Sequence, residues 1–411
     1  MKPASDSRRS GREYSRRQFG KAAAGIVPFF SMRPSAILGQ TAPPNLPADL
    51  GPISTGGTMS KKEVLNPAGV WSLWTPRMIL GGVEYHDLET ARALAPTWME
   101  WIDVWSALGA KHRAKAEELK AAGSTLSAGH AYRRAAACYH FGKFVWAEDE
   151  QKNGYATEAA VSCTRAALQS LDPNHRRITA ENGEFKVVGY LRFPAENADS
   201  YALVVLVPGT DSTKEEFTSW ETVILDRGLA CLTLDGPGQG EVFHMGTRME
   251  PAYEKTLALG LDAVASDPRI DMNRVGIAGT SLGGYYVVRG AAFEPRVRAL
   301  VSISGPMSLD FDALPAHTRA TMKLYSRSLD DQEARERIKR YDLEGILPRV
   351  KQPTLIATGK MDRIVPWTRT KAIADGIPQA DFRLYEDGNH ALTNVAYEFR
   401  DLSADWLKAH L

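Results

Sequence analysis

The sequence has little cysteine and almost no net charge. Its 411 residues include three cysteines, and 50 Lys plus Arg stand against 49 Asp plus Glu, a net charge of +1. Three cysteines are too few for a disulfide framework, and their wide spacing is not that of a zinc site. A balanced charge argues against a nucleic-acid partner. We expect Cys138, Cys163 and Cys231 to be buried free thiols; the first two could meet only if their helices pack together.

The apolar run near the N-terminus is too short to span a membrane. Residues 22–32 are interrupted by Gly25 and Pro28, and they follow the pair Arg16 and Arg17. This order is typical of a twin-arginine export signal. We therefore predict a signal over residues 1–40, cleaved between about residues 36 and 45, export by the twin-arginine machinery, and a periplasmic or secreted protein. A basic tail without fixed structure is the alternative.

Internal repeats are also missing, and the composition changes along the chain instead. Residues 41–69 are rich in Pro, Gly, Ser and Thr, which predicts a linker. Residues 70–175 have helical periodicity and predict a helical cap segment. One helix is expected to start at Ser127, with an apolar face that carries Tyr132, Ala135, Ala136, Tyr139 and Trp146. A second is expected over about residues 154–170, ending before Asp172 and Pro173.

Residues 176–411 have the pattern of a catalytic α/β domain. The turn dipeptide Asn182-Gly183 predicts a hairpin between residues 177–180 and 186–193. Beyond it, short apolar runs alternate with helical segments. These runs, at residues 203–207, 230–234, 275–278, 299–303, 354–358 and 382–385, predict strands buried on both faces. The expected fold class is α/β, an α/β-hydrolase fold whose mostly parallel sheet is flanked by helices.

Ser281 is the candidate nucleophile. It lies in Gly279-Thr280-Ser281-Leu282-Gly283, between a predicted buried strand and an apolar helical run. This strand, sharp turn and helix form the nucleophile elbow, in which glycines permit the close approach of strand and helix. The turn places the serine at a helix N-terminus, where free amides favour negative charge. An ordinary serine in a tight turn is the alternative.

Asp362 and His390 are the candidate partners of the serine. A serine hydroxyl needs a general base and an acid that orients this base, and α/β-hydrolases supply them in the order Ser, Asp, His. Asp362 follows the run at residues 354–358, and His390 follows the run at residues 382–385. Both therefore lie beyond strand ends, where α/β sheets place their sites. Glu386 and Asp387 are the competing choices for the orienting acid, and we rank them below Asp362.

The oxyanion hole is expected to combine two backbone amides. The first is that of Leu282, directly after the nucleophile. The second should come from Pro208-Gly209-Thr210-Asp211, after the run at residues 203–207, with Thr210 preferred and Asp211 next. Loss of one such donor costs on the order of 3 kcal/mol in barrier height.

Three motifs together resemble the 2,6-dihydroxypseudooxynicotine hydrolase group, over about residues 60–411. They are residues 208–217, residues 235–241 and residues 281–286. The resemblance implies an α/β-hydrolase with an N-terminal helical cap, the triad Ser281, Asp362 and His390, and hydrolysis of carbon–carbon bonds beside esters or amides. The chain departs from the group in Pro208-Gly209-Thr210, where paired glycines are common, and in its export signal.

Other residues are secondary candidates. Asp312 could be an additional acid for proton transfer to a leaving carbanion, although a solvated or helix-capping residue is the favoured interpretation. The candidates for lining the pocket from the cap are His130, Tyr139, His140 and Trp146, and for these too packing is favoured. Residues 235–241 lack the end of a phosphate-binding P-loop, which favours a structural turn at the active-site rim.

The sequence thus predicts a serine hydrolase that acts on a small carbonyl substrate, either a carboxylic ester or a carbon–carbon bond of acyl-aromatic or diketone type. No metal or organic cofactor is expected. The first alternative is a peptidase of the prolyl-oligopeptidase kind, against which the lack of propeller repeats argues. The second is a binding protein of the same fold without turnover. The oligomeric state stays open, with a homodimer as one option.

Overall fold

The computed structural model describes residues 67–183 and 185–411. The predicted signal and most of the predicted linker lie outside these residues. Within them, no helix combines the length and the apolar character that a membrane span requires. The linker prediction reached residue 69, but helix α1 (Pro67–Leu80) already starts at Pro67. Proline is favoured in the first helical turn, because its fixed φ suits the helix and its missing N–H is not needed there.

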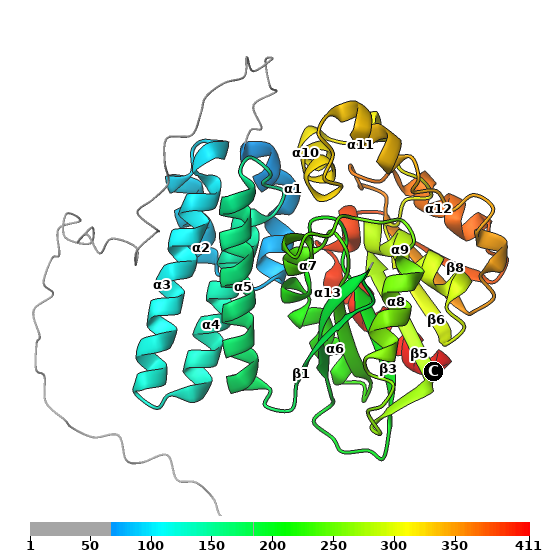
Figure 1. Cartoon of the computed structure of the whole chain (residues 1–411), viewed down its shortest axis with the longest axis horizontal. Helices are drawn as coiled ribbons and strands as arrows, with labels where there is room; N and C mark the ends of the chain where they lie inside the picture. Colours follow the sequence, from blue (N-terminus) through cyan, green and yellow to red (C-terminus); the bar gives the residue numbers. More distant parts are fainter. Residues whose placement is uncertain (1–66, 184) are drawn as a thin grey trace, which may run out of the picture. The chain divides into compact units, whose positions relative to one another are not determined.

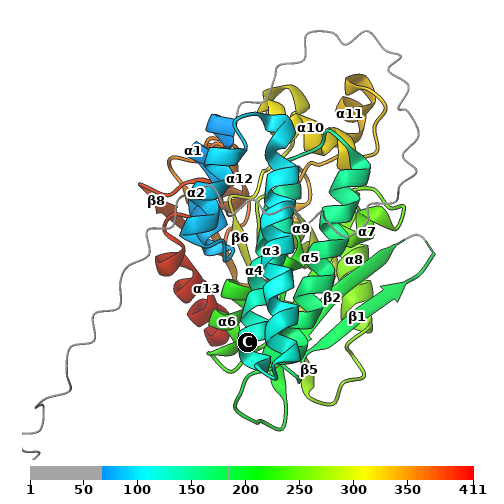
Figure 2. The same cartoon turned by 90° about the vertical axis from the view of Figure 1, so that its left-hand side faces the viewer.

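The N-terminal part of the described chain is helical. After α1 come α2 (Tyr85–Leu94), α3 (Trp101–Ala121), α4 (Thr125–Lys143) and α5 (Glu150–Leu171). Figures 1 and 2 show α3, α4 and α5 running side by side. The N-cap of α4 is Ser124 and not Ser127 as predicted. Gly123 has a left-handed φ of +76° and ends the preceding helix, so the next helix already starts at Thr125.

An eight-stranded sheet forms the centre of the remaining chain, in the order β1-β2-β4-β3-β5-β6-β7-β8. The predicted hairpin of β1 and β2 is present, β2 pairs antiparallel with β4, and all later neighbours are parallel. The strands are β1 (Arg176–Glu181), β2 (Lys186–Arg192), β3 (Tyr201–Val207), β4 (Ala230–Asp235), β5 (Ile270–Thr280), β6 (Val297–Ile303), β7 (Thr354–Gly359) and β8 (Ala380–Tyr385).

Helices cover both faces of this sheet (Figure 1). One face packs against α6 and α13, and the other packs against α8, α9 and α12. Strand β3 is apolar throughout because both of its faces are buried. Leu203 and Val205 pack in the core on one face of the sheet, and Val204 and Leu206 pack in the core on the other face. The helices here are α6 (Thr218–Leu225), α7 (Gly240–His244), α8 (Tyr253–Asp262), α9 (Leu282–Phe293), α10 (Ala316–Tyr325), α11 (Asp331–Ile338), α12 (Trp367–Asp375) and α13 (Ala396–His410).

Strand β8 differs from the prediction of burial on both faces. Its residues are half-buried or exposed, and Arg383 points to solvent beside Asp381. As an edge strand it pairs only with β7, so part of its surface stays accessible. The three cysteines, in contrast, are buried and free, and Cys138 and Cys163 form no disulfide although α4 and α5 pack together.

Candidate active site

Ser281 occupies a strained turn between β5 and α9. Its backbone has φ 56° and ψ −125°, a conformation that costs a non-glycine residue free energy and is common at functional sites. Its amide donates to the carbonyl oxygen of Ile303 on the neighbouring strand, at 2.8 Å. A Cβ atom added at Gly279 would overlap the carbonyl of Gly283, and one added at Gly283 would overlap that of Val207. The turn therefore tolerates only glycine at these two positions.

Asp362 and His390 meet as expected from their places after β7 and β8. His390 Nδ1 lies 2.8 Å from Asp362 Oδ2, and the two residues are only 6% and 8% exposed. The other carboxylate oxygen of Asp362 accepts from the amides of Ile364, at 2.9 Å, and Val365, at 2.8 Å. The competing acids point elsewhere, because Asp387 is exposed and Glu386 pairs with Lys360 at the surface.

One pocket brings the serine and the histidine together. It holds about 470 Å³ of empty space, and Ser281, His390, Thr210 and Leu282 all line it. Its apolar wall comes from residues after β6, on α10 and after β7, namely Pro306, Leu309, Leu314, Met322, Ile364 and Val365. Within residues 67–183 and 185–411, the Ser281 hydroxyl has no hydrogen-bond partner, so it is free to face a substrate.

The loop of Gly209 and Thr210 packs directly against the elbow. A Cβ atom added at Gly209 would lie 3.0 Å from Ser281 Cβ and 3.6 Å from the amide nitrogen of Leu282. A glycine here therefore lets the loop approach the serine. Gln239 fixes the position of this loop, because its Nε2 donates to the carbonyl oxygens of Pro208, at 2.7 Å, and Gly209, at 3.2 Å.

Gln239 is itself fixed, which explains the turn at residues 235–241. Its Oε1 accepts from the amide of Gly236, at 2.8 Å, and from the hydroxyl of Tyr253, at 3.0 Å. The same turn is tied to residues 208–217 by Lys214, which is fully buried and pairs with Asp235, at 3.0 Å, and Glu241, at 2.7 Å. Two of the three motifs that carry the family resemblance are thus joined by one cluster of buried ion pairs.

The Asp211 side chain also lines the pocket. Burial raises the pKa of this carboxyl group, although the Thr321 side chain and then the positive charge on Arg77 oppose the shift. Its Oδ1 atom is buried and has no hydrogen-bond partner in the described part of the chain. The wall of this pocket therefore includes a carboxyl group.

The sequence did not indicate the two cap residues that close the pocket, Trp74 and Arg77 of α1. Trp74 packs edge-on against His390, with 5.8 Å between the ring centres. Arg77 pairs with Glu216, at 2.5 Å and 2.7 Å, hydrogen-bonds Ser212, and stacks on the ring of Phe144. Burial alone would raise the pKa of Glu216, but Arg77 and His140 hold it well below its usual range.

The cap residues that the sequence did indicate lie elsewhere. His140 is buried and bonds Glu216 and Thr213, at 3.1 Å and 3.3 Å. Trp146 and Tyr139 belong to the cap core, and His130 is exposed. None of the four lines the pocket, so packing within the cap explains the buried ones. Asp312, the candidate additional acid, does not line the pocket either: it is exposed and forms a bidentate pair with Arg335.

One group of potential metal ligands exists among the described residues. Asp87, His112 and Cys138 come together from α2, α3 and α4. His112 Nε2 lies 2.6 Å from Asp87 Oδ2, and burial raises the pKa of the Cys138 thiol. The group is separate from the pocket of Ser281 and explains none of its chemistry.

Comparison with known proteins agrees with this geometry. The model of the family described as "Esterase FrsA-like" matches residues 96–408. A curated relative, the 2,6-dihydropseudooxynicotine hydrolase of Paenarthrobacter nicotinovorans, is 32% identical over 335 residues, which cover 80% of this chain and 90% of the relative. The hydrolase acrC of Aspergillus aculeatus is 33% identical over 224 residues, or 49% of this chain and 52% of that protein.

Solved structures show the same fold. The crystal structure of the 2,6-dihydroxy-pseudo-oxynicotine hydrolase matches with a TM-score of 0.75 and 31% identity, over 82% of this chain and 95% of that chain. Wild-type AbyA5 matches with a TM-score of 0.58 and 20% identity, over 75% and 88%, which supports the fold alone. The chain is a hydrolase with the α/β-hydrolase fold, and it belongs to the FrsA-like esterase family.

Proposed function

We propose that this hydrolase is a serine enzyme that cleaves a small carbonyl substrate, either a carboxylic ester or a carbon–carbon bond of acyl-aromatic or diketone type. The observation that carries the proposal is the joint placement of three groups. The Ser281 hydroxyl stands free in a strained turn, His390 lines the same pocket, and the far nitrogen of His390 is bound by buried Asp362. This is the arrangement in which a serine gains a general base with a fixed tautomer.

In the proposed mechanism, Asp362 accepts the Nδ1–H of His390, which leaves Nε2 free to take the proton of Ser281. The serine oxygen then attacks the substrate carbonyl. The amides of Leu282 and Thr210 stabilise the oxyanion, and Gln239 keeps the Thr210 loop in place for this task. His390 returns the proton to the leaving group, and water releases the acyl-enzyme.

For a carbon–carbon bond, the leaving group is a stabilised carbanion, and the same histidine delivers the proton to it. The similarity to a 2,6-dihydropseudooxynicotine hydrolase supports this branch, whereas the family description supports the ester branch. The pocket is closed on the cap side by Trp74 and Arg77, which favours a small molecule over a peptide.

The test compares wild type with Ser281→Ala on a short-chain p-nitrophenyl ester, an amide and an aryl 1,3-diketone. We expect turnover of an ester or the diketone and a loss of at least about 10³-fold in Ser281→Ala. Ser162→Ala, at an exposed position on α5, is the matched control and should keep full activity. A fluorophosphonate probe that labels Ser281→Ala as well as wild type would contradict the proposal, and so would equal turnover by both.

Export is proposed separately, because residues 1–66 lie outside the described residues. The pair Arg16 and Arg17 supports it. In a bacterial host with a twin-arginine system, the wild type should reach the periplasm, and a variant with both arginines changed to lysine should stay in the cytoplasm. Equal distribution of the two proteins would refute this route.

A further inference from the structure

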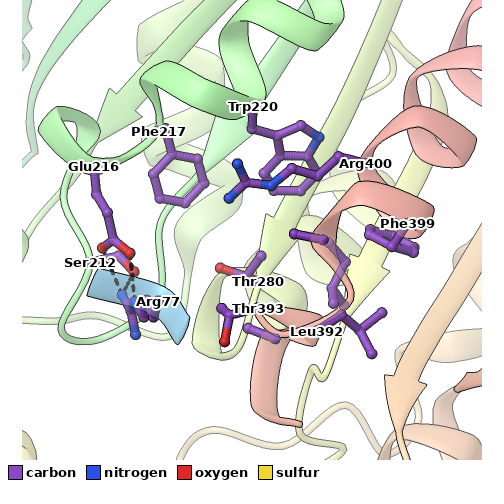
Figure 3. A pocket seen from close by; sticks show the side chains of 13 residues that line it. Arg77, Ser212, Glu216, Phe217, Trp220, Thr280, Leu392, Thr393, Phe399 and Arg400 are labelled. Carbon is purple, nitrogen blue, oxygen red and sulfur yellow. Dashed lines mark hydrogen bonds and ion pairs between the residues drawn. The ribbon is translucent and has the colours of Figure 1, made fainter. Parts of the chain in front are cut away.

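A second pocket adjoins the active site. It holds about 440 Å³ of empty space, and Arg400 of α13 reaches into it (Figure 3). Its wall includes Thr280, the residue before the nucleophile, and Ala391, the residue after His390. It also shares Arg77 with the pocket of Ser281. We call this second space the Arg400 pocket.

The Arg400 pocket has more positive than negative charge. Arg77 and Arg400 contribute two guanidinium groups, and Glu216 contributes the carboxylate. Both oxygens of Glu216 are used on the side of the cap, by the two nitrogens of Arg77, and His140 makes a further contact. Glu216 thus compensates Arg77, and one positive charge of the pocket stays without a counterion.

Arg400 carries that charge. In the described part of the chain its side chain has one hydrogen bond, from Nη1 to the hydroxyl oxygen of Ser219 at 2.5 Å, and it forms no ion pair. The Ser219 hydroxyl donates in turn to the carbonyl oxygen of Leu80. Burial lowers the pKa of Arg400 to about 10. The charge of Glu216 opposes this shift, and the charge of Arg77 adds to it. The guanidinium is partly buried against the ring of Trp220 and has no counterion, which favours an anion beside it.

The remaining walls define the kind of anion. Figure 3 shows the guanidinium of Arg400 extending across Trp220 toward Phe217, with the Thr280 side chain on the same pocket. Phe217 and Phe399 supply apolar surface, and the Thr280 hydroxyl has no partner in the described chain. Guanidinium groups bind carboxylates through two parallel hydrogen bonds, and a hydroxyl can add a third.

We propose that the Arg400 pocket is a binding site for a small organic carboxylate. The carboxylate group pairs with the free N–H groups of Arg400, and the hydroxyl of Thr280 donates to it. The apolar part of the ligand packs against Phe217 and Phe399. A fully charged inorganic phosphate is a poorer match, because a single unpaired guanidinium faces aromatic walls.

Arg400 does not line the pocket of Ser281, so the test of this site does not require that Ser281 react by the proposed mechanism. Butyrate is the probe, and its binding is followed by ligand-observed NMR and calorimetry. The protein is used in two forms, unmodified and with the active site filled by a bulky competitive ligand or a phosphonate on Ser281. We expect butyrate to bind both forms with dissociation constants that agree within about twofold.

Variants of Arg400 locate the site. Arg400→Gln should weaken butyrate binding by at least about tenfold, because it removes a charge-assisted pair. Arg400→Lys keeps the charge and should weaken binding less, so it also serves if the glutamine variant does not fold. Arg383→Gln is the matched control, since Arg383 is exposed and paired with Asp381. It should bind like wild type.

Four results would overturn the proposal. They are no binding of butyrate to wild type, loss of binding once the active site is filled, equal affinity of wild type and both Arg400 variants, and stronger binding of inorganic phosphate than of butyrate.

Discussion

His390 Nδ1 and Asp362 Oδ2 are 2.8 Å apart, and both side chains are almost completely removed from solvent. The remaining oxygen of Asp362 is held by two backbone amides, so the carboxylate cannot rotate without losing three hydrogen bonds. The contact with Asp362 therefore fixes the imidazole ring in one orientation. The direction of its Nε2 atom is set by this contact and does not depend on a bound substrate.

Replacing Asp362 by Asn should lower kcat by about 10³- to 10⁴-fold, because the amide can stabilise the wrong tautomer of His390. The fold should stay intact, since the Asn oxygen can still accept from the amides of Ile364 and Val365. Steady-state kinetics and a thermal melt measure the two effects. Glu386→Gln and Asp387→Asn are the controls, and a comparable loss of activity in either would mean that the wrong acid has been assigned.

Replacing Gln239 by Leu should lower kcat more than it changes KM, on the order of ten- to a hundredfold. The change removes the two hydrogen bonds that hold the carbonyls of Pro208 and Gly209, and with them the position of the Thr210 amide. Gln379→Leu is the matched control, because the Gln379 amide also donates to two backbone carbonyls but lies far along the chain, before β8. If both variants lose the same fraction of activity, Gln239 has no special role.

Replacing Trp74 by Ala should broaden the acyl range of the enzyme. Trp74 lines the pocket of Ser281 and also a neighbouring surface pocket, and His390 lines both. Removal of the indole should connect these spaces, so the ratio of kcat/KM for a long-chain ester to that for a short-chain ester should rise by at least about tenfold. Trp71→Ala on the same helix, where the ring packs on Trp101, controls for damage to the cap. An unchanged ratio would show that Trp74 does not limit the substrate.

Acid should weaken the fold partly through His317. Burial lowers the pKa of His317 to about 4, below the ordinary value of about 6.5. Between these values the unfolded chain binds a proton that the folded chain refuses, so this contribution to stability is present above pH 6.5 and is lost as the pH falls toward 4.

Replacing His317 by Gln, which is neutral at every pH, should therefore reduce the drop in Tm between pH 7.5 and pH 4.5 by a few degrees. Scanning calorimetry at the two pH values measures it. His130→Gln, at an exposed position of α4, should show the same drop as wild type. A drop in His317→Gln as large as that of wild type would contradict the argument.

The sequence predicted the centre of the site because its signals are local. The glycines around Ser281 are required by contacts with their own strand and helix, and Asp362 and His390 follow predicted strands directly. The carboxyl ends of parallel strands lie at the same edge of a sheet. The positions of the three residues directly after predicted strands were therefore sufficient to predict that they lie near one another. The catalytic roles of these residues stay a prediction until the variants are measured.

The cap could not be predicted in the same way. Helix α1 is apolar on several sides, so its pattern does not tell which face meets the sheet, and Trp74 and Arg77 were missed. The aromatic residues of α4 have a clear apolar face, but that face meets α3 and α5 rather than the pocket. Which face of a helix turns toward another domain depends on tertiary packing, and periodicity shows only that a face is buried.

The contact between Trp74 and His390 joins the first described helix to a loop close to the end of the chain. Residues 74 and 390 lie far apart in the sequence, so this side of the pocket forms only when the helical segment docks on the sheet. In the proposed mechanism, a fragment that ends before residue 390 has neither this contact nor the base of Ser281. Such a fragment should be inert toward esters even where its remaining helices and strands fold.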